Sequence, residues 1–320
     1  MTVAGVRADE SLGLRRYCER LQAALALEDV DYLLARRPQP PLPAHWHFGN
    51  SSRAAAWLTL ATPPPRLVTV HDVRPRMRAL MAAYRAVVHP RLYRRAAAIV
   101  VHSRFAADML VADAGVAADR VHVIPHPASP RPLVARLEAR RLLAWPDDGR
   151  IAVVPGVLKQ AKLVEDILSG AQQFMRTGRW RLAFVGRIAD ERLARAARAA
   201  GALLIEDPDD RTYEHAVSAA DAVLVFRADS VGESNGPLLD ALGAGKAVLA
   251  SRVGSIPEVA GDAALFAAAT ATGVQAGLAA LEDASVRDDL ERRARARRMQ
   301  LRWEAAARLH AELFAEVLGA

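Results

Sequence analysis

The sequence predicts an α/β protein of two doubly wound domains, each a parallel sheet that binds ligands at the carboxyl ends of its strands. The chain has 320 residues, which is enough for two domains of ordinary size. In both halves, short β-rich runs alternate with helical patterns, as they do in βαβ units. A basic segment with proline near both ends, Ala128–Arg150, lies between the halves and is expected to be a linker.

The first half is expected to begin with a strand and a helix. Apolar residues recur there at helical spacing and make one face, namely Leu14, Tyr17, Cys18, Leu21 and Leu25. Short apolar runs indicate buried strands, and the expected strands of this half are Thr2–Arg7, Val30–Leu34, His45–Phe48, Arg66–Val70, Ala98–Val101 and Val121–Ile124. Helices are expected over Arg74–Tyr93 and Phe105–Ala112.

The second half repeats this alternation. Its expected strands are Ile151–Val154, Leu182–Val185, Ala202–Ile205, Ala222–Phe226 and Ala247–Ala250. Its expected helices are Val164–Phe174, Glu191–Ala200, Asp210–Ala219 and Pro237–Ala244. We place the domain boundary near Pro146. This gives an N-terminal domain at 1–145, a C-terminal domain at 146–300, and a final helix at 301–320 that is able to return to the first domain.

Composition narrows the class of protein. Hydrophobic residues make up 52% and charged residues 25%, which excludes a disordered chain, a collagen and a disulfide-rich scaffold. The single cysteine, Cys18, cannot form an internal disulfide, and we expect a cytoplasmic protein. The net charge of +7 has two interpretations. One is a phosphate-bearing partner, and the other is coding bias, because only three of the 43 basic residues are lysines.

The segment Ala222–Ser251 carries the strongest chemical signal. A buried strand ends at Phe226 and a loop follows it, leading to Gly236 and Pro237 at the start of a helix. A glycine there lets the backbone approach a ligand, and the free N–H groups of a helix start favour phosphate. Glu233 on the loop can accept hydrogen bonds from hydroxyls, and Asp240 suits a ribose diol. The alternative is an ordinary strand–loop–helix with a solvated glutamate.

This segment resembles a known family. It reads G-E-S-N-G-P-L-L-D-A-L-G-A-G-K-A-V, similar to the E-G-F-G-L-P-L-L-E-A-M-A-x-G-x-P-V of retaining glycosyltransferases of family four. Ser251–Val259 and Ile99–Pro127 also resemble family segments. The resemblance implies the GT-B fold, in which two Rossmann-like domains face an interdomain cleft. It also implies a nucleoside-diphosphate sugar as donor, retention of anomeric configuration, and neither metal nor cofactor.

The resemblance also implies roles for residues of the second half. The donor-binding residues would be Gly156, Lys162, Glu233, Ser234, Asn235, Gly236 and Asp240. Lys162 matches the family's phosphate-binding lysine, and a lysine between a strand and a helix could reach a diphosphate. Glu233 takes the first carboxylate role by a shifted register, because Gly232 occupies the family's position. Val157 stands where the family has an arginine.

The acceptor side is expected in the first half. His71 ends the stretch T-V-H-D, similar to a family element whose histidine faces the cleft, so the catalytic residues would be Glu233, His71 and Lys162. Gly13, His47 and Asn50 would line the same side. The alternative for His71 is a loop histidine bonded to its neighbours. We expect His45 and His47 to project from opposite faces of their strand and therefore not to share a metal ion.

Two further motifs have alternative interpretations. Asp207-Pro208-Asp209 formally matches a D-x-D metal motif but fits a turn and a helix cap better, so we expect no metal. The stretch Arg74–Arg95 predicts a basic amphipathic helix. Such a helix fits an anionic membrane surface and would put the protein at the inner face of the membrane. A helix packed on the core with a solvated arginine face is the alternative.

We therefore expect a metal-independent glycosyltransferase that moves a sugar from a nucleoside-diphosphate sugar to a glycan, lipid-linked or small-molecule acceptor. Three rivals stay open. A non-catalytic GT-B partner subunit would bind donor and transfer nothing, and a sugar-nucleotide epimerase would form product without acceptor. A nucleic-acid-binding protein, which we do not expect, would show steep salt dependence.

Overall fold

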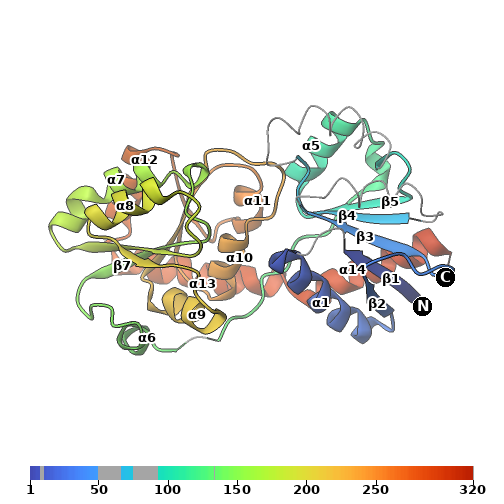
Figure 1. Cartoon of the computed structure of the whole chain (residues 1–320), viewed down its shortest axis with the longest axis horizontal. Coiled ribbons are helices and arrows are strands. Elements are labelled where there is room, and N and C mark those ends of the chain that lie inside the picture. The colour runs from blue at the N-terminus through green and yellow to red at the C-terminus, as the bar shows by residue number, and fades with distance from the viewer. Residues whose placement is uncertain (8–10, 50–65, 75–92, 133, 320) are drawn as a thin grey trace. The chain divides into compact units, whose positions relative to one another are not determined.

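The computed structural model describes residues 1–7, 11–49, 66–74, 93–132 and 134–319 (Figure 1). The chain divides into two compact units. The first unit is Met1–Pro127, Val231–Ser234 and Leu301–Ala320, and the second is Ala128–Ser230 and Asn235–Gln300. Asn50 and residues 75–92 of the expected basic helix lie outside the described residues.

The first unit is built around a six-stranded parallel sheet of strand order β2-β1-β3-β4-β5-β6. Its strands are β1 (Thr2–Arg7), β2 (Asp31–Ala35), β3 (Ala44–Phe48), β4 (Arg66–Val70), β5 (Ala98–Val101) and β6 (Val121–Val123). The described helices are α1 (Leu12–Leu25), α5 (Arg104–Ala114) and the terminal α14 (Trp303–Leu318).

Alternation along the strands gives this sheet two buried faces. On β4, Val68 packs in a cluster with α5, whereas the adjacent Leu67 packs in a cluster with α1 and α14. Cys18 lies buried in the second cluster, as expected from its place on the apolar face of its helix. The terminal helix therefore contributes to the core that the first residues of the chain begin.

The second unit is also built around a six-stranded parallel sheet, of strand order β12-β11-β10-β7-β8-β9. Its strands are β7 (Arg150–Pro155), β8 (Trp180–Val185), β9 (Leu203–Ile205), β10 (Ala222–Val225), β11 (Val248–Ser251) and β12 (Leu265–Ala267). Its helices are α6 (Arg136–Leu142), the short 3₁₀ helix η3 (Gln160–Lys162), α7 (Val164–Arg176), α8 (Glu191–Ala199), α9 (Asp210–Ala219), α10 (Gly236–Gly243), α11 (Ile256–Ala260), α12 (Ala271–Ala280) and α13 (Ala284–Gln300). The two sheets confirm the predicted fold class.

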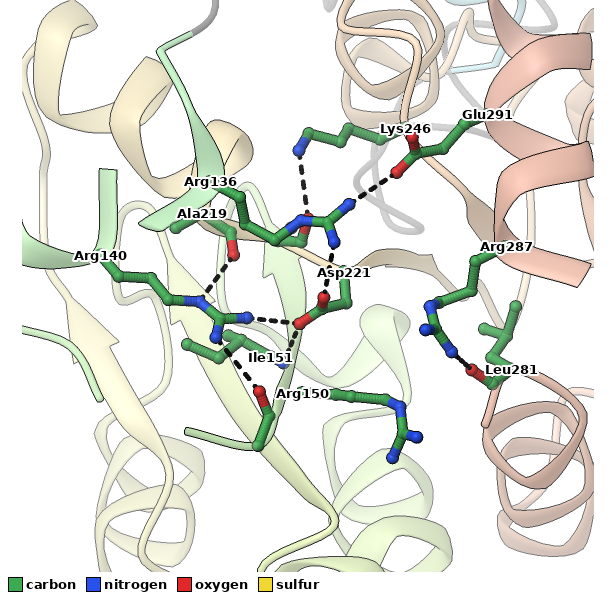
Figure 2. A network of polar contacts seen from close by, with 12 residues as sticks. Arg136, Arg140, Arg150, Ile151, Ala219, Asp221, Lys246, Leu281, Arg287 and Glu291 are labelled. Atoms are coloured by element: carbon green, nitrogen blue, oxygen red, sulfur yellow. Dashed lines mark hydrogen bonds and ion pairs between the residues drawn. The ribbon is translucent and has the colours of Figure 1, made fainter. Parts of the chain in front are cut away.

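A network of charged groups holds α6, near the start of the second unit, to the rest of that unit (Figure 2). Arg140 on α6 is buried and pairs with Asp221 at 2.5 Å, and Asp221 also accepts the N–H of Ile151 at 2.7 Å. Arg136 joins Asp221 to Glu291 with ion pairs of 3.0 and 2.9 Å. Because these contacts tie α6 to the second sheet, this unit begins at Ala128, ahead of the boundary expected near Pro146.

Candidate functional site

The carboxyl ends of β7 and β10 mark the point where the strand order of the second sheet reverses. The chain runs from β7 outward through β8 and β9, and then returns to β10 on the other side of β7. Ligands of doubly wound sheets bind at such a switch point, in the crevice outside the strand ends. The sequence-predicted donor residues Gly156, Lys162 and Gly236 all lie in the segments that follow these two strands, Lys162 at the end of η3 and Gly236 at the start of α10.

Gly156, directly after β7, lies where the segment that carries Lys162 meets the start of α10. Its φ of +97° is a conformation that residues with a side chain rarely adopt. A Cβ on Gly156 would lie 3.1 Å from Cγ of Pro237 and 3.3 Å from Nζ of Lys162. The absence of a side chain therefore keeps open the space between an ammonium group and the start of α10.

Lys162 is the last residue of η3 and is only 7% exposed. Its ammonium donates to the carbonyl of Pro155 at 3.3 Å. The loop after β10 lies beside it, because the N–H of Ala228 donates to the carbonyl of Ala161 at 3.1 Å. The cation is thus held at the switch point and not on a solvated surface.

The start of α10 offers a phosphate fewer backbone N–H groups than the sequence suggests. Asn235 caps the helix, and its side chain accepts the N–H of Leu238 at 3.1 Å. Pro237 has no N–H to offer. Among the described residues of this first turn, Gly236 therefore keeps an N–H that the cap does not use, while Asn235 has a structural bond beside its expected ligand role.

Asp240, expected to hold a ribose, already has two partners within the second unit. Arg131 contacts its Oδ1 through Nε at 3.1 Å and Nη2 at 2.5 Å. The hydroxyl of Tyr213 donates to its Oδ2 at 2.9 Å. Arg131 also pairs with Glu214 at 3.4 Å. A ligand hydroxyl at Asp240 must therefore share the carboxylate with these groups or replace one of them.

Glu233 and Ser234 belong to the first unit by their contacts. The segment is anchored where the carbonyl of Val231 accepts the N–H of Arg74 at 2.9 Å. A Cβ on Gly232 would lie 2.6 Å from the side chain of Val73, so the backbone packs closely there. The carboxylate of Glu233 is 6% exposed and accepts the N–H of Val231 at 2.8 Å.

Four histidines of the first unit, His45, His47, His71 and His102, lie on its strands or directly after them. They form a hydrogen-bonded network with Tyr32 and Thr69. Tyr32 Oη lies 2.8 Å from His45 Nδ1 and 2.7 Å from His47 Nε2, and His45 Nε2 lies 2.7 Å from Thr69 Oγ1. His71 lies 3.4 Å from His47 and 3.1 Å from His102, whose Nδ1 is 2.9 Å from the carbonyl of Ile124.

The expectation that His45 and His47 face opposite sides is wrong. Residues two apart on a strand share a face, and their ring centroids are 4.3 Å apart with Tyr32 bonded to both. The described residues nevertheless contain no cluster of histidine, cysteine or acidic side chains arranged to hold a metal ion. Asp209 caps α9 by accepting the N–H of Thr212 at 2.7 Å, as the turn-and-cap interpretation predicted.

Burial keeps these imidazoles uncharged at neutral pH. It lowers the pKa of His45, His47 and His71 well below 6.5, and neighbouring histidines lower it further. Burial also lowers the pKa of His102 well below 6.5. His71 itself has both ring nitrogens in hydrogen bonds, so the structure places it in a satisfied network at a half-exposed position.

Sequence reasoning missed His102 and His126. The signal is present in the chain, because β3, β4, β5 and β6 each have a histidine in their last two residues or within three residues after their end. Parallel strands bring such positions to one edge of the sheet. Tyr17 on α1 completes the group, with its ring 4.7 Å from that of His71, 5.2 Å from His102 and 4.9 Å from His126. Gly13, by contrast, lies exposed in the first turn of α1, where nothing approaches its Cβ position.

Comparison with known proteins agrees with this architecture. Residues 6–131 match the family model of Glycosyltransferase Family 4. No curated protein sequence matches the chain. Within the described part of the chain, every helix is too short or too polar to cross a bilayer.

Several solved structures share the fold along the whole chain. Sucrose-phosphate synthase of Thermosynechococcus elongatus has a TM-score of 0.80 at 16% identity, covering 100% of this chain and 99% of that one. Anabaena HepE, solved with UDP and glucose, has a TM-score of 0.79 at 13% identity and coverage of 99% and 100%. WaaG, a glycosyltransferase of lipopolysaccharide biosynthesis, has 0.70 at 16%, with coverage of 99% and 100%. The chain therefore has the GT-B fold of these enzymes, and its residues 6–131 match Glycosyltransferase Family 4.

Proposed function

We propose that the protein is a retaining glycosyltransferase that uses a nucleoside-diphosphate sugar and needs no metal ion. The observation that carries the proposal is the convergence of Gly156, Lys162 and the start of α10 at the switch point of the second sheet. The family match over residues 6–131 supports the activity, and the UDP bound by HepE supports the donor class.

Charge stabilisation is the main catalytic contribution that we propose. Lys162 and the N–H of Gly236 would stabilise the negative charge of the leaving diphosphate. These two groups would supply the positive charge that a metal ion would otherwise provide. Glu233 would accept hydrogen bonds from hydroxyls of the transferred sugar. Because no side chain among the described residues of the site is an evident nucleophile, the donor phosphate would take the proton of the acceptor hydroxyl.

We propose an acceptor that is a glycan, a lipid-linked sugar or a small molecule bound by the first unit. The basic stretch Arg74–Arg95 supports a lipid-linked acceptor at an anionic membrane surface, since basic residues gain about 1 kcal/mol each there. Vesicle binding at low salt, compared with binding at high salt, distinguishes this from a soluble acceptor.

Ligand-induced stabilisation tests the proposal with the protein alone. We expect one family of nucleoside diphosphates and its sugar conjugates to raise the melting temperature, equally with and without EDTA, because ligands that bind only the folded state stabilise it by mass action. With the donor so identified, NMR of the transfer product should show the anomeric configuration of the donor. Loss of transfer in EDTA with recovery in Mg²⁺ or Mn²⁺ would return the D-x-D motif to consideration.

Removal of the Lys162 ammonium should weaken donor binding. A charge-assisted phosphate contact is worth about 1.5–3 kcal/mol, so Lys162→Ala should raise the Kd of the nucleoside diphosphate about 10- to 100-fold in calorimetry. Lys159→Ala, three residues earlier, is the matched control and should leave the Kd within about threefold. Equal Kd values for wild type and Lys162→Ala would exclude the proposed phosphate contact.

A non-catalytic sugar-nucleotide-binding subunit is the second candidate. Two observations favour it: Val157 replaces the usual arginine, and Arg131 and Tyr213 already hold Asp240. Such a subunit would bind the donor in calorimetry but would neither transfer nor hydrolyse a labelled sugar. The enzyme would show measurable transfer and hydrolysis.

A further inference from the structure

The chain of histidines in the first unit ends on a group that can only accept a hydrogen bond. Nδ1 of His102 lies 2.9 Å from the carbonyl oxygen of Ile124, and a carbonyl has no proton to give. Nδ1 of His102 must therefore carry the proton. In a neutral imidazole this leaves Nε2 as an acceptor.

This one anchor fixes the tautomer of the next ring. Nε2 of His102 accepts, so the partner 3.1 Å away, Nδ1 of His71, must donate. Nε2 of His71 then carries the lone pair. It accepts from Nδ1 of His47, 3.4 Å away.

The same logic continues to the far end of the chain. Nδ1 of His47 donates, so its Nε2 accepts the hydroxyl proton of Tyr32 at 2.7 Å. The oxygen of Tyr32 in turn accepts from Nδ1 of His45 at 2.8 Å, and Nε2 of His45 accepts from Thr69 at 2.7 Å. All four histidines of this hydrogen-bonded network are thus Nδ1–H tautomers, and each donor is directed along the network toward Ile124.

A ligand can reach this chain at His71. His45 and His47 are 0% exposed and His102 is 4% exposed, whereas His71 is half-buried at the carboxyl end of β4. The His47–His71 link is also the longest of the chain, so it is the one that a ligand hydroxyl replaces or shares most readily.

We infer that His102, anchored on the carbonyl of Ile124, is a positioning residue that holds His71 in the Nδ1–H tautomer, so that His71 offers the lone pair of Nε2 to a hydroxyl group of the bound ligand. The ligand group is a hydrogen-bond donor of neutral character, such as a sugar hydroxyl. The inference rests on the proposed function in one respect, namely that the ligand is a sugar.

The inference also says what His71 does not do. An uncharged imidazole whose Nδ1 proton is committed to His102 orients a hydroxyl and does not store its proton. The low pKa of His71 agrees, because burial and the neighbouring imidazoles oppose the imidazolium form.

Tautomers can be read directly by two-bond ¹H–¹⁵N correlation of histidine-labelled protein, without any substrate. We expect His45, His47, His71 and His102 all to be protonated at Nδ1, in contrast to free histidine, which favours Nε2–H. A His71 ring protonated at Nε2 in the wild type overturns the inference.

Variants of His102 separate positioning from packing. His102→Leu fills the space but offers no acceptor, and we expect His71 to lose its single tautomer. His102→Gln places an amide oxygen near the former Nε2 and should preserve the Nδ1–H signal of His71. His122→Gln, on the adjacent strand and outside the chain of bonds, is the control and should change nothing. If His102→Leu fails to fold, His102→Asn replaces it, since the shorter amide can meet Ile124 but not His71.

Activity gives a second, separable readout. With donor and acceptor identified, we expect His102→Leu to lower kcat/KM about 3- to 10-fold, as for loss of one neutral hydrogen bond, and His102→Gln to recover most of it. An unchanged His71 tautomer in His102→Leu overturns the positioning role even if transfer is active. A protein that transfers no sugar contradicts the proposed function, and the NMR result still decides the tautomer.

Discussion

Each unit of the molecule buries a polar network, and the two networks are built from opposite chemistry. In the first unit the network consists of neutral imidazoles and hydroxyls, and it runs from His45 near the start of β3 to His71 and His102, which follow the ends of β4 and β5. In the second unit it consists of paired charges at the amino ends of β7, β10 and β11, where Arg140, Asp221 and Lys246 lie (Figure 2). Burial lowers the pKa of Lys246 to about 8, while its ammonium donates to two carbonyls.

This difference indicates that the charged network stabilises the fold, whereas the uncharged network is suited to contact a ligand. Ligands of such sheets bind at the carboxyl edge, so a charged network at the amino edge can be fully satisfied by the protein itself. An uncharged network that reaches the carboxyl edge can exchange one hydrogen bond for another with a ligand, since no buried charge is left without a partner. Three predictions test this contrast, in order of decreasing effect.

Acid should destabilise the first unit more than the second. Because the folded-state pKa of His45, His47, His102 and His310 is lowered, the unfolded state binds more protons below its own pKa of 6.5. The stability that these groups contribute is complete above pH 6.5 and falls as the pH drops below it. Each of these groups therefore destabilises the folded state further as the pH falls below 6.5, and their combined effect is expected to be the largest of the three.

Hydrogen exchange of backbone amides between pH 7.5 and 5.5 can follow the two units separately, once rates are corrected for intrinsic pH dependence. Protection should be lost first in β3, β4 and β5, while β7 and β10 keep theirs. Equal loss in both sheets would contradict the assignment of neutral buried imidazoles.

Removal of Asp221 should break the charged network. Asp221→Ala leaves the buried guanidinium of Arg140 without its carboxylate, and loss of one partner of a buried pair costs about 3–5 kcal/mol. Denaturant unfolding measures this change. As a control, Asp148→Ala removes the ion pair between Asp148 and Arg181. The side chain of Asp148 is 80% exposed, so this change should cost less than about 1 kcal/mol. Similar losses for the two variants would remove the distinction.

Removal of the last hydroxyl of the neutral chain should have the smallest effect. Thr69→Val keeps the shape of the side chain and leaves Nε2 of His45 without its donor, at a cost of about 1–3 kcal/mol in unfolding free energy. Thr177→Val, at an exposed hydroxyl that bonds to its own helix, is the control and should stay within about 0.5 kcal/mol. An unchanged unfolding free energy in Thr69→Val would show that the hydrogen-bonded network does not depend on the Thr69 hydroxyl.

The convergence of Gly156, Lys162 and Pro237 in the second unit could be predicted from the sequence because its signals are local. A glycine after a strand, a lysine before a helix and a proline at a helix start each have a meaning within a few residues. Strand order then brings Gly156, Lys162 and Pro237 together, as the carboxyl ends of parallel strands require. The last strand, Leu265–Ala267, was not predicted from the sequence.

Contacts across long stretches of sequence could not be predicted in this way. Arg131 and Asp240 are separated by 109 residues, and nothing near either residue indicates the pairing. The histidine chain was partly visible, since a histidine near four strand ends is a pattern. Its bonds to Tyr32 and Thr69 depend on the register between β1, β2, β3 and β4, which local sequence does not specify.

The return of α14 to the first unit has a consequence for biosynthesis. The core under α1 includes Ala307, Leu313 and Phe314, and the ring of Phe314 stacks on Tyr32 at 6.2 Å. During translation these residues leave the ribosome after the whole second unit, whose own core comes from residues between Ala152 and Leu290. The unit that is synthesised first therefore closes its core last, with α1 waiting for its partner helix while the second unit folds.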